Sequence, residues 1–255
     1  MGNITVDLNS PSPYAEPDSK LYRFKRKLTV KTILKWVKAA AKGRQTFSLL
    51  EIGTGSGFLM SFLESQFPNA KLRGIEYDPR LVTIAQSKIK NAKISQCNAE
   101  EFYFAGEQFD IIVSLQVIEH LYQPDRMFDA VRKHLRPDGV FIFTTPNLGG
   151  LGARVMKSNW HAFSFDHVSL KSFDDWKAAA ERRGFSSIYC GSTFFSGIPW
   201  MNRLPLALLN WGLLLTFGAW RWKHGESFVG VFRHGKPAVD WGEAVGRRGV
   251  GVREQ

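Results

Sequence analysis

The sequence predicts an α/β fold in which one largely parallel sheet of seven strands is covered by helices on both faces. Short apolar runs with the length of buried strands recur along the chain, and segments with helical periodicity alternate with them. Each connecting helix carries the chain back to the same end of the sheet, so this alternation favours parallel strands. The predicted strands are residues 47–53, 71–77, 92–97, 109–115, 139–146, 186–190 and 227–234.

Local signals support the helices between these strands. The helix at 28–42 interleaves apolar residues with lysines, so we expect one buried face and one basic face. Pro79 suits the first turn of its helix. Ser172 suits an N-cap because Asp175 follows three residues later, and Gly184 suits the end of the same helix. The predicted helices are residues 28–42, 58–67, 79–90, 124–135 and 172–185.

A chain of 255 residues fits one substantial domain, which we place at residues 20–234. Residues 1–19 are rich in proline, serine and asparagine and are expected to form a flexible arm. Residues 235–255 carry glycine and charge with little apolar periodicity and are expected to form a mobile basic tail. Two widely separated cysteines and the lack of a signal pattern at the N-terminus favour a cytoplasmic location.

Positive charge is concentrated near the start of the predicted domain. The net charge is +11, and the segment from Lys20 to Arg44 holds ten lysines or arginines and no acidic residue. A basic face of this kind attracts phosphate groups, either in nucleic acid or in anionic lipid headgroups. A solvated helix face accounts for the pattern equally well, so the charge alone does not identify a partner.

The stretch LLEIGTGSGF forms the turn after the first predicted strand. Gly53, Gly55 and Gly57 allow the backbone to pass close to a ligand, and the next helix points its N-terminus at the same place. A dinucleotide site would need a glycine where Phe58 stands. Glu51 lies two residues before the first glycine, and a carboxylate there favours a cationic ligand over a pyrophosphate.

A second acid, Glu76, ends the second predicted strand in GIEYDP, where it can accept hydrogen bonds from both ribose hydroxyls. With these motifs the chain resembles the class I S-adenosylmethionine-dependent methyltransferases. The resemblance covers roughly Leu21 to His234 and rests on EIGTGSG, GIEYDP, NAEEF, FDIIVSLQVIEHL and LRPDGVFIFTTPN, in that order. It implies a Rossmann-like sheet and S-adenosyl-L-methionine as the cofactor.

The resemblance also implies where each part of the cofactor would lie. Glu51 would lie near the amino group, and Glu76 would hold the ribose. Asn98 and Ala99 would flank the adenine, and Gln116 would line the methionine end. The residues that would wrap the methionine part are Gly53, Thr54, Gly55 and Gly57.

Methyl transfer requires an aligned acceptor and, for a hydroxyl acceptor, a group that removes a proton. The segment QVIEHL after the fourth strand offers Glu119 and His120 as catalytic candidates. It resembles the E-V-x-E-H segment of the ubiquinone-biosynthesis type O-methyltransferases, in which these residues are linked to acceptor binding and a divalent metal. Gln116 replaces the first glutamate here, so we expect no metal. Alternatively, Glu119 caps the next helix and His120 packs beneath it.

The segment NWHAFSFDHVSL lies on a long loop after the fifth strand and adds His161, Asp166 and His167. His167 is the third catalytic candidate, as a base or an acceptor contact, and a loop histidine bonded to backbone is the alternative. Asp166 and His167 are adjacent in sequence, which does not by itself predict a pair. Asn147, in TTPN, is a further candidate for contact with the acceptor.

Residues 204–220 carry no charge, and their length lies at the lower limit of the roughly 17–25 residues that span a membrane. Both flanking strands belong to one sheet, so the segment has to return as a helical hairpin or a shallow re-entrant element. We therefore expect an apolar helical insert, or lid, at 191–226. Its tryptophans and basic residues within 197–223 suit a membrane surface. A lid packed on its own domain or on a dimer partner is the alternative.

Together these observations predict an S-adenosylmethionine-dependent methyltransferase acting on a small or lipid-linked acceptor, at oxygen rather than nitrogen or carbon. The insert favours an acceptor presented by a membrane, with the protein peripheral on the inner membrane face. The charge keeps an RNA methyltransferase as an alternative, but no RNA-binding module accompanies it, so nucleic acid is not the expected partner. A non-catalytic, cofactor-binding, membrane-associated protein is the other alternative. The sequence does not predict the oligomeric state.

Overall fold

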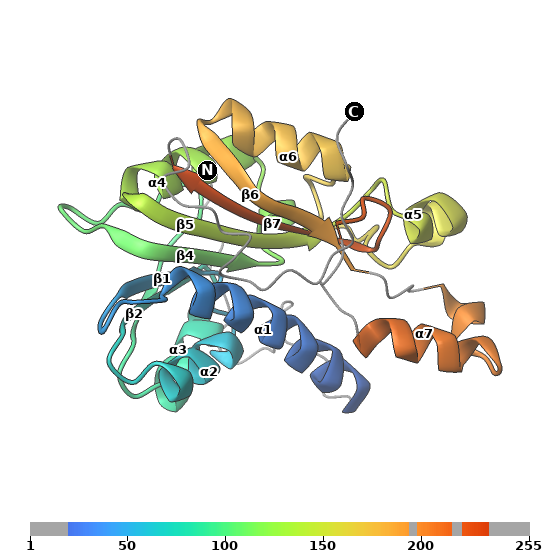
Figure 1. Cartoon of the computed structure of the whole chain (residues 1–255), viewed down its shortest axis with the longest axis horizontal. Coiled ribbons are helices and arrows are strands. Elements are labelled where there is room, and N and C mark those ends of the chain that lie inside the picture. The colour runs from blue at the N-terminus through green and yellow to red at the C-terminus, as the bar shows by residue number, and fades with distance from the viewer. Residues whose placement is uncertain (1–19, 194–197, 216–220, 235–255) are drawn as a thin grey trace.

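The computed structural model describes residues 20–193, 198–215 and 221–234 (Figure 1). Its seven strands form one sheet in the order β3-β2-β1-β4-β5-β7-β6. All paired neighbours are parallel except β7, which runs antiparallel to β5 and to β6. The predicted α/β fold with a mostly parallel sheet of seven strands is confirmed. The strands are β1 (Ser48–Ile52), β2 (Lys71–Glu76), β3 (Lys93–Gln96), β4 (Phe109–Leu115), β5 (Leu135–Pro146), β6 (Phe185–Ser192) and β7 (Ser227–His234).

Helices cover both faces of this sheet (Figure 1). Helices α1, α2 and α3 contribute buried residues to the core on one face, and α4 and α6 contribute to the core on the other. The helices are α1 (Lys20–Ala40), α2 (Phe58–Gln66), α3 (Pro79–Lys88), α4 (Pro124–His134), α5 (Leu151–Met156), α6 (Phe173–Arg182) and α7 (Leu206–Leu215). Short 3-10 turns are η1 (Ile118–His120), η2 (Lys157–Asn159) and η3 (Pro199–Asn202).

The middle of β5 shows how the sequence divides the core between the two faces. Val140 and Ile142 belong to the core beneath α1–α3, whereas Phe141 and Phe143 belong to the core beneath α4 and α6. Side chains alternate along a strand, and a strand buried on both faces is therefore apolar throughout. The parallel strands β1, β2, β4 and β5 consequently end at one edge of a rigid sheet, where the glycine turn and QVIEHL lie.

Two element boundaries differ from the prediction by four residues or more. Helix α1 begins at Lys20 rather than at residue 28, because the apolar positions Leu21, Phe24 and Leu28 continue the helical pattern through a segment rich in basic residues. Strand β5 begins at Leu135 rather than at residue 139, since the chain leaves α4 in extended conformation and Leu135 pairs with Phe109. Helix α5 has only six residues, too few to show a period in the sequence.

The connection between β6 and β7 contains η3 and the ten-residue helix α7, which packs against η3 and α1. Among the helices that the structure describes, none combines the length and the apolar character needed to cross a bilayer. The predicted arm at 1–19 and tail at 235–255 lie outside the described residues, as do residues 194–197 and 216–220 of the connection.

Candidate active site

The turn after β1 has the backbone geometry that its glycines predict. Gly53, Gly55 and Gly57 have φ angles of 74°, 55° and 84°, in the left-handed region that side chains other than glycine rarely adopt. The backbone N–H groups of Gly53 and Thr54 both donate to the carbonyl of Ile75 in β2. These bonds fix the turn directly in front of α2, so its backbone borders the carboxyl ends of β1 and β2.

Glu76, at the end of β2, connects two neighbouring loops through its carboxylate. Its Oε2 accepts from the N–H of Gly55 at 2.8 Å, and its Oε1 accepts from the N–H groups of Tyr77 at 2.8 Å and Asp78 at 3.0 Å. A carboxylate has about four acceptor positions, so these three bonds leave roughly one for a ligand. The predicted ribose acid therefore also holds the glycine turn in place.

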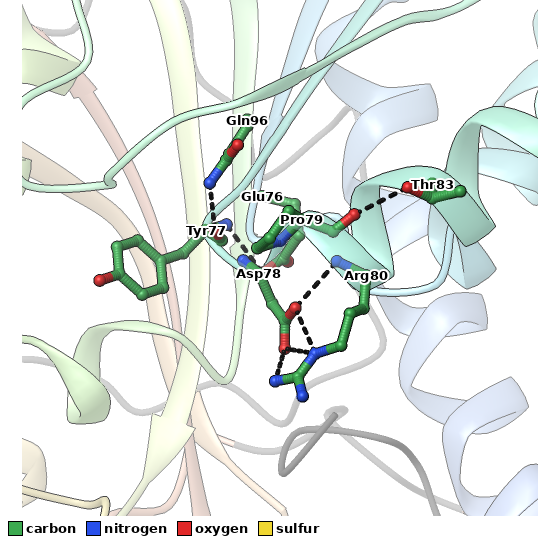
Figure 2. Close-up of polar contacts among 7 residues, drawn as sticks. All are labelled: Glu76, Tyr77, Asp78, Pro79, Arg80, Thr83 and Gln96. Carbon is green, nitrogen blue, oxygen red and sulfur yellow. Dashed lines mark hydrogen bonds and ion pairs between the residues drawn. The ribbon is translucent and has the colours of Figure 1, made fainter. Parts of the chain in front are cut away.

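The turn from β2 into α3 is held by several polar contacts (Figure 2). Asp78 caps α3 by accepting from the N–H of Arg80 at 2.9 Å, and it pairs with the Arg80 guanidinium at 2.8 Å. Gln96 donates to the carbonyl of Tyr77 at 3.3 Å. The Tyr77 ring points away from this cluster and is 63% exposed, which leaves it available at the edge of the site.

Glu51 is buried at the end of β1 beside the glycine turn. Among the described residues its Oε2 atom has no hydrogen-bond partner. Burial raises the pKa of Glu51 well above its usual range, while the positive charge of Arg26 acts in the opposite direction. Arg26, from α1, lies 4.4 Å above the ring of Phe58. A buried carboxyl with an unused oxygen is suited to a ligand that carries an ammonium group.

The predicted adenine contacts follow β3. The N–H of Cys97 donates to the carbonyl of Glu76 at 2.9 Å, which places Asn98 next to the end of β2. The Asn98 side chain accepts from the N–H of Glu100 at 2.9 Å and so shapes its own turn. Ala99 is buried in the core beneath α4 and α6. The structure thus brings the segment to the expected edge but gives both residues a structural role as well.

Gln116 follows β4 in an unusual backbone conformation. Its φ angle is 53°, one of two positive φ values among the described residues other than glycine. Such strain is often found at functional sites. With the amide placed so that both ends are satisfied, its nitrogen donates to Oε1 of Glu119 at 3.2 Å and its oxygen accepts from the N–H of Thr145 at 3.3 Å. Gln116 therefore positions Glu119.

The three predicted catalytic residues, Glu119, His120 and His167, lie together. One ligand-type atom from each falls within 4.8 Å of the others, and the two imidazole rings meet edge to face with centroids 4.7 Å apart. Glu119 and His120 come from η1, whereas His167 comes from the loop after η2. The N–H of Ser169 donates to the carbonyl of Glu119 at 2.9 Å and fixes this loop against η1.

Backbone and carboxylate acceptors orient both histidines of the cluster. Nδ1 of His120 lies 3.1 Å from the carbonyl oxygen and 3.2 Å from the carboxylate of Asp166. Nδ1 of His167 lies 2.7 Å from the carbonyl oxygen of Ala162. Because these partners can only accept, each Nδ1 carries the hydrogen and each Nε2 is the basic nitrogen. Burial and the neighbouring His167 lower the pKa of His120, which keeps it neutral near neutral pH.

Glu119 is completely buried, and burial raises its pKa to about 8. It is therefore protonated near neutral pH and can donate a hydrogen bond. Its Oε2 atom has no hydrogen-bond partner among the residues that the structure describes. It does not cap the next helix, since the N–H of Gln123 at the start of α4 donates instead to Glu100 at 2.6 Å. The alternative of a capping role for Glu119 is therefore wrong.

Two other candidates have structural roles or lie apart. Asn147 is buried, donates to the carbonyls of Lys223 and Gly225, and accepts from two backbone N–H groups, so it ties β5 to the chain before β7. His161 is exposed and packs against Trp160, outside the Glu119–His120–His167 cluster. Sequence reasoning missed the roles of Asp166 and Arg26, because each acts on a residue distant in the chain.

The loop that carries His167 also presents apolar side chains to solvent. Phe163, Phe165 and Val168 are 47%, 94% and 42% exposed. Nearby, residues of α5, η2 and this loop line an open hollow of about 450 Å³. Apolar groups beside polar catalytic candidates suit an acceptor with an apolar body and one reactive polar group. The residues lining the hollow are Ala153, Lys157, Ser158 and Phe163.

Comparison with known proteins agrees with this geometry. The family described as "Methyltransferase domain" matches residues 22–189. The chain is 26% identical over 155 residues to a malonyl-[acyl-carrier protein] O-methyltransferase of Paenibacillus sp., covering 56% of each protein. It is 29% identical over 107 residues to a ubiquinone biosynthesis O-methyltransferase of Cereibacter sphaeroides, covering 40% of this chain and 42% of the relative. The chain thus spans about half or less of the length of these relatives.

A solved S-adenosylmethionine-dependent methyltransferase from Clostridium acetobutylicum has the same fold, with a TM-score of 0.61. Its sequence is only 13% identical, over 82% of this chain and 92% of that one, so this likeness concerns the fold alone. The family assignment rests on the family match instead. Because that match covers well over half of the sequence, the chain belongs to this methyltransferase-domain family.

Proposed function

We propose that this enzyme methylates a hydroxyl oxygen of a small or lipid-linked acceptor, and that Nε2 of His120 removes the proton. The observation that supports this most directly is the contact of 3.2 Å between Nδ1 of His120 and the carboxylate of Asp166. A carboxylate on one side of an imidazole orients the ring and stabilises the imidazolium that forms when the other nitrogen accepts a proton.

The residues around the glycine turn fit the cofactor. S-adenosylmethionine supplies a methyl group already activated by its sulfonium. Glu51 offers its unused buried oxygen to the amino group of the cofactor, and Glu76 offers its remaining acceptor position to the ribose. Asn98 and Ala99 would flank the adenine. The residues that would hold the methionine part are Gly53, Thr54, Gly55, Gly57 and Gln116.

The Glu119–His120–His167 cluster supplies the groups needed at the acceptor. His120 is neutral near neutral pH, as a base must be, because its pKa lies below the ordinary histidine value. Glu119, protonated under the same conditions, can donate a hydrogen bond to the acceptor oxygen and help to position it. His167 presents its basic nitrogen to the same space, as a second acceptor contact.

The same three residues have the composition of a two-histidine, one-carboxylate metal site. We propose catalysis without a metal, for two chemical reasons. With no cation bound, burial raises the pKa of Glu119 to about 8, so a cation would have to compete with its proton near neutral pH. Gln116, which stands where the resemblance would place a second carboxylate, is a neutral amide and a weak ligand.

The acceptor class is inferred from surface chemistry and from the relatives. Phe163, Phe165 and Val168 are exposed on the loop that carries Asp166 and His167, and they would contact the apolar part of an acceptor. The relatives are a malonyl-[acyl-carrier protein] O-methyltransferase and a ubiquinone biosynthesis O-methyltransferase, so both are named for methylation at oxygen. An oxygen atom on a partly apolar molecule suits both observations, and a hydroxyl is the acceptor that needs the base that His120 supplies.

The test is incubation of cell extract, membranes included, with methyl-labelled S-adenosylmethionine and either the natural enzyme or the His120→Ala variant. We expect label in the organic-solvent fraction with the natural enzyme, in a methyl ether that resists mild base, and little label with the variant. Asp174→Asn is a control, since Asp174 is an exposed residue paired with Lys223. Label found in RNA, with equal rates for both enzymes, would overturn the proposal.

A further inference from the structure

The first turn of helix α7 carries leucines on the side that faces solvent. Leu206, Leu208 and Leu209 are 40%, 71% and 58% exposed, while Ala207 and Asn210 are buried. At 100° per residue the three leucines lie on one arc of the helix and the buried pair lies opposite. A helix on the surface of a water-soluble protein shows the reverse pattern, because its apolar stripe faces the core.

The chain leading into α7 continues this apolar surface. Leu204 is 76% exposed, and Trp200, in the η3 turn that packs against α7, is 52% exposed. Leucines that are this exposed contribute little hydrophobic stabilisation unless another apolar phase covers them. Tryptophan is enriched where such a phase meets water, because its ring has an apolar body and a polar N–H.

Helix α1 presents a row of positive charge to solvent. Lys27, Lys31, Lys35, Lys38 and Lys42 are all exposed. Their spacing places them within an arc of about 80° on a helix. The opposite side of α1 is buried in the core, and no acidic residue occurs in the segment 20–44. The row is therefore a single-sign charged stripe from Lys27 in α1 to Lys42 in the turn that follows the helix.

The helices that carry the apolar surface and the lysine row are in contact. Helix α7 packs against α1, and Figure 1 shows α7 beside the amino-terminal part of α1, at the edge where the active-site loops lie. We infer that α7 and α1 together bind the surface of an anionic lipid bilayer, with the leucines of α7 among the acyl chains and the lysines of α1 at the headgroup phosphates. Apolar burial combined with charge attraction is the usual basis of such peripheral binding.

Charge favours a bilayer over the other occupants of this surface. A second copy of the chain would cover the leucines, but it would bring two molecules of net charge +11 together beside their lysine rows. RNA would be attracted to the lysines, but it gives the exposed leucines nothing to pack against. An anionic bilayer satisfies both features. The inference rests on the proposed function only in that a bilayer would present a lipid-linked acceptor to the active site.

The experiment is flotation of the purified full-length protein, without any methyl acceptor, on vesicles of phosphatidylcholine with or without phosphatidylglycerol. We expect strong binding only to vesicles with phosphatidylglycerol, weakened by salt. The variant Lys27→Glu/Lys31→Glu should bind at least roughly 20-fold more weakly, since each lysine contributes about fivefold. The variant Leu206→Ser/Leu208→Ser/Leu209→Ser should lose binding even at low salt.

The matched control is Lys90→Glu/Lys133→Glu, which makes the same charge change at exposed lysines of other elements and should bind like the natural protein. All substituted side chains are exposed, so every variant should fold. Cofactor affinity, measured by calorimetry, verifies this. Equal binding by the control and Lys27/Lys31 variants would overturn the inference. A natural protein that is a dimer, together with a leucine variant that is a monomer, would also overturn it. RNA binding that the leucine variant retains would overturn it as well. None of these results would affect the proposed methyl transfer, which is measured separately.

Discussion

Asp166 contacts His120, which is 46 residues away, rather than the adjacent His167. The loop after η2 folds back over η1, where the bond from Ser169 N–H to the Glu119 carbonyl fixes it. His167 turns its Nδ1 instead to the carbonyl of Ala162, at 2.7 Å. Asp166 and His167, which are adjacent in sequence, thus contact different residues. This carboxylate contact is why we propose His120, rather than His167, as the base.

Replacing Asp166 with asparagine tests this relationship. The negative charge and backbone oxygen of Asp166 both raise the pKa of His120, so removing the charge lowers that pKa further. His120 then stays neutral to lower pH, but it is a weaker and less well oriented base. We expect the acidic limb of the kcat/KM profile to move to lower pH and the plateau to fall roughly 10- to 100-fold.

Asp174→Asn is the matched control for this measurement, because it removes an exposed carboxylate that pairs only with Lys223 among the described side chains. It should leave both the plateau and the acidic limb unchanged. An Asp166→Asn enzyme with natural plateau activity would show that the carboxylate does not support His120. A fall in plateau without any movement of the acidic limb would assign Asp166 a purely structural role.

Glu119 makes stability depend on pH. Its pKa rises from about 4.5 in the unfolded chain to about 8 in the folded protein, because burial penalises the charged form. The folded state therefore binds the extra proton between these two values, and stability falls as pH rises through this window. We expect Glu119→Gln to lose this dependence, so that it gains a few kcal/mol relative to the natural protein between about pH 5 and about pH 9.

Urea denaturation of both proteins at the two pH values measures this difference. The buried Glu51 also has a raised pKa, but it is present in both proteins and cancels from the comparison. Parallel pH dependence in the natural protein and the Glu119→Gln variant would contradict the assignment. Activity gives a second check, since a neutral glutamine mimics the protonated acid and should retain acceptor affinity at low pH better than Glu119→Ala does.

Removal of divalent metal tests whether the Glu119–His120–His167 cluster acts without a bound cation. Because Glu119 is protonated and Gln116 is an amide, we expect turnover to be unchanged after treatment with a chelator and dialysis. His167→Ala should weaken acceptor binding whether or not metal is added. Loss of activity with the chelator, restored by magnesium or zinc, would show that Glu119, His120 and His167 hold a cation during catalysis.

The sequence predicted the features that depend on local pattern. Apolar runs and glycine turns identified seven strands, and the position of QVIEHL after β4 predicted that Glu119 and His120 lie at the cofactor edge. His167 was proposed only as a base or acceptor contact on the loop after the fifth strand. The structure brings it next to them, since loops after β4 and β5 meet at one edge of a parallel sheet. In a parallel sheet, motifs that follow neighbouring strands lie close together in space.

Features that depend on contacts between distant segments could not be predicted from the sequence. The contact of Asp166 with His120 requires the path of a long loop, which no local pattern specifies. The burial of Arg26 beside Glu51 requires the packing of α1 onto the turn after β1, and its basic neighbours in sequence suggested solvent instead. Helix α5 has too few residues to produce a period. In each case the missing information is a contact between distant segments.

Gly53 allows the clearest test of the glycine turn. Its φ is 74°, and a Cβ at this position would lie 2.2 Å from Cγ2 of Val117 in the loop after β4. Gly53→Ala therefore adds a clash to backbone strain, and we expect a loss of about 2–5 kcal/mol in stability. Since Val117 or the turn has to move, cofactor affinity measured by calorimetry should fall at least roughly tenfold.

Gly43 provides the matched control, because its φ is 81° but a Cβ there would meet nothing within 4 Å. Gly43→Ala should cost only about 1–2 kcal/mol of backbone strain and leave cofactor affinity unchanged. The double variant Gly53→Ala/Val117→Ala removes the clash but keeps the strain, so it should recover most of the affinity. Failure of the double variant to recover would mean that the left-handed backbone of Gly53, rather than its packing against Val117, is what the cofactor requires.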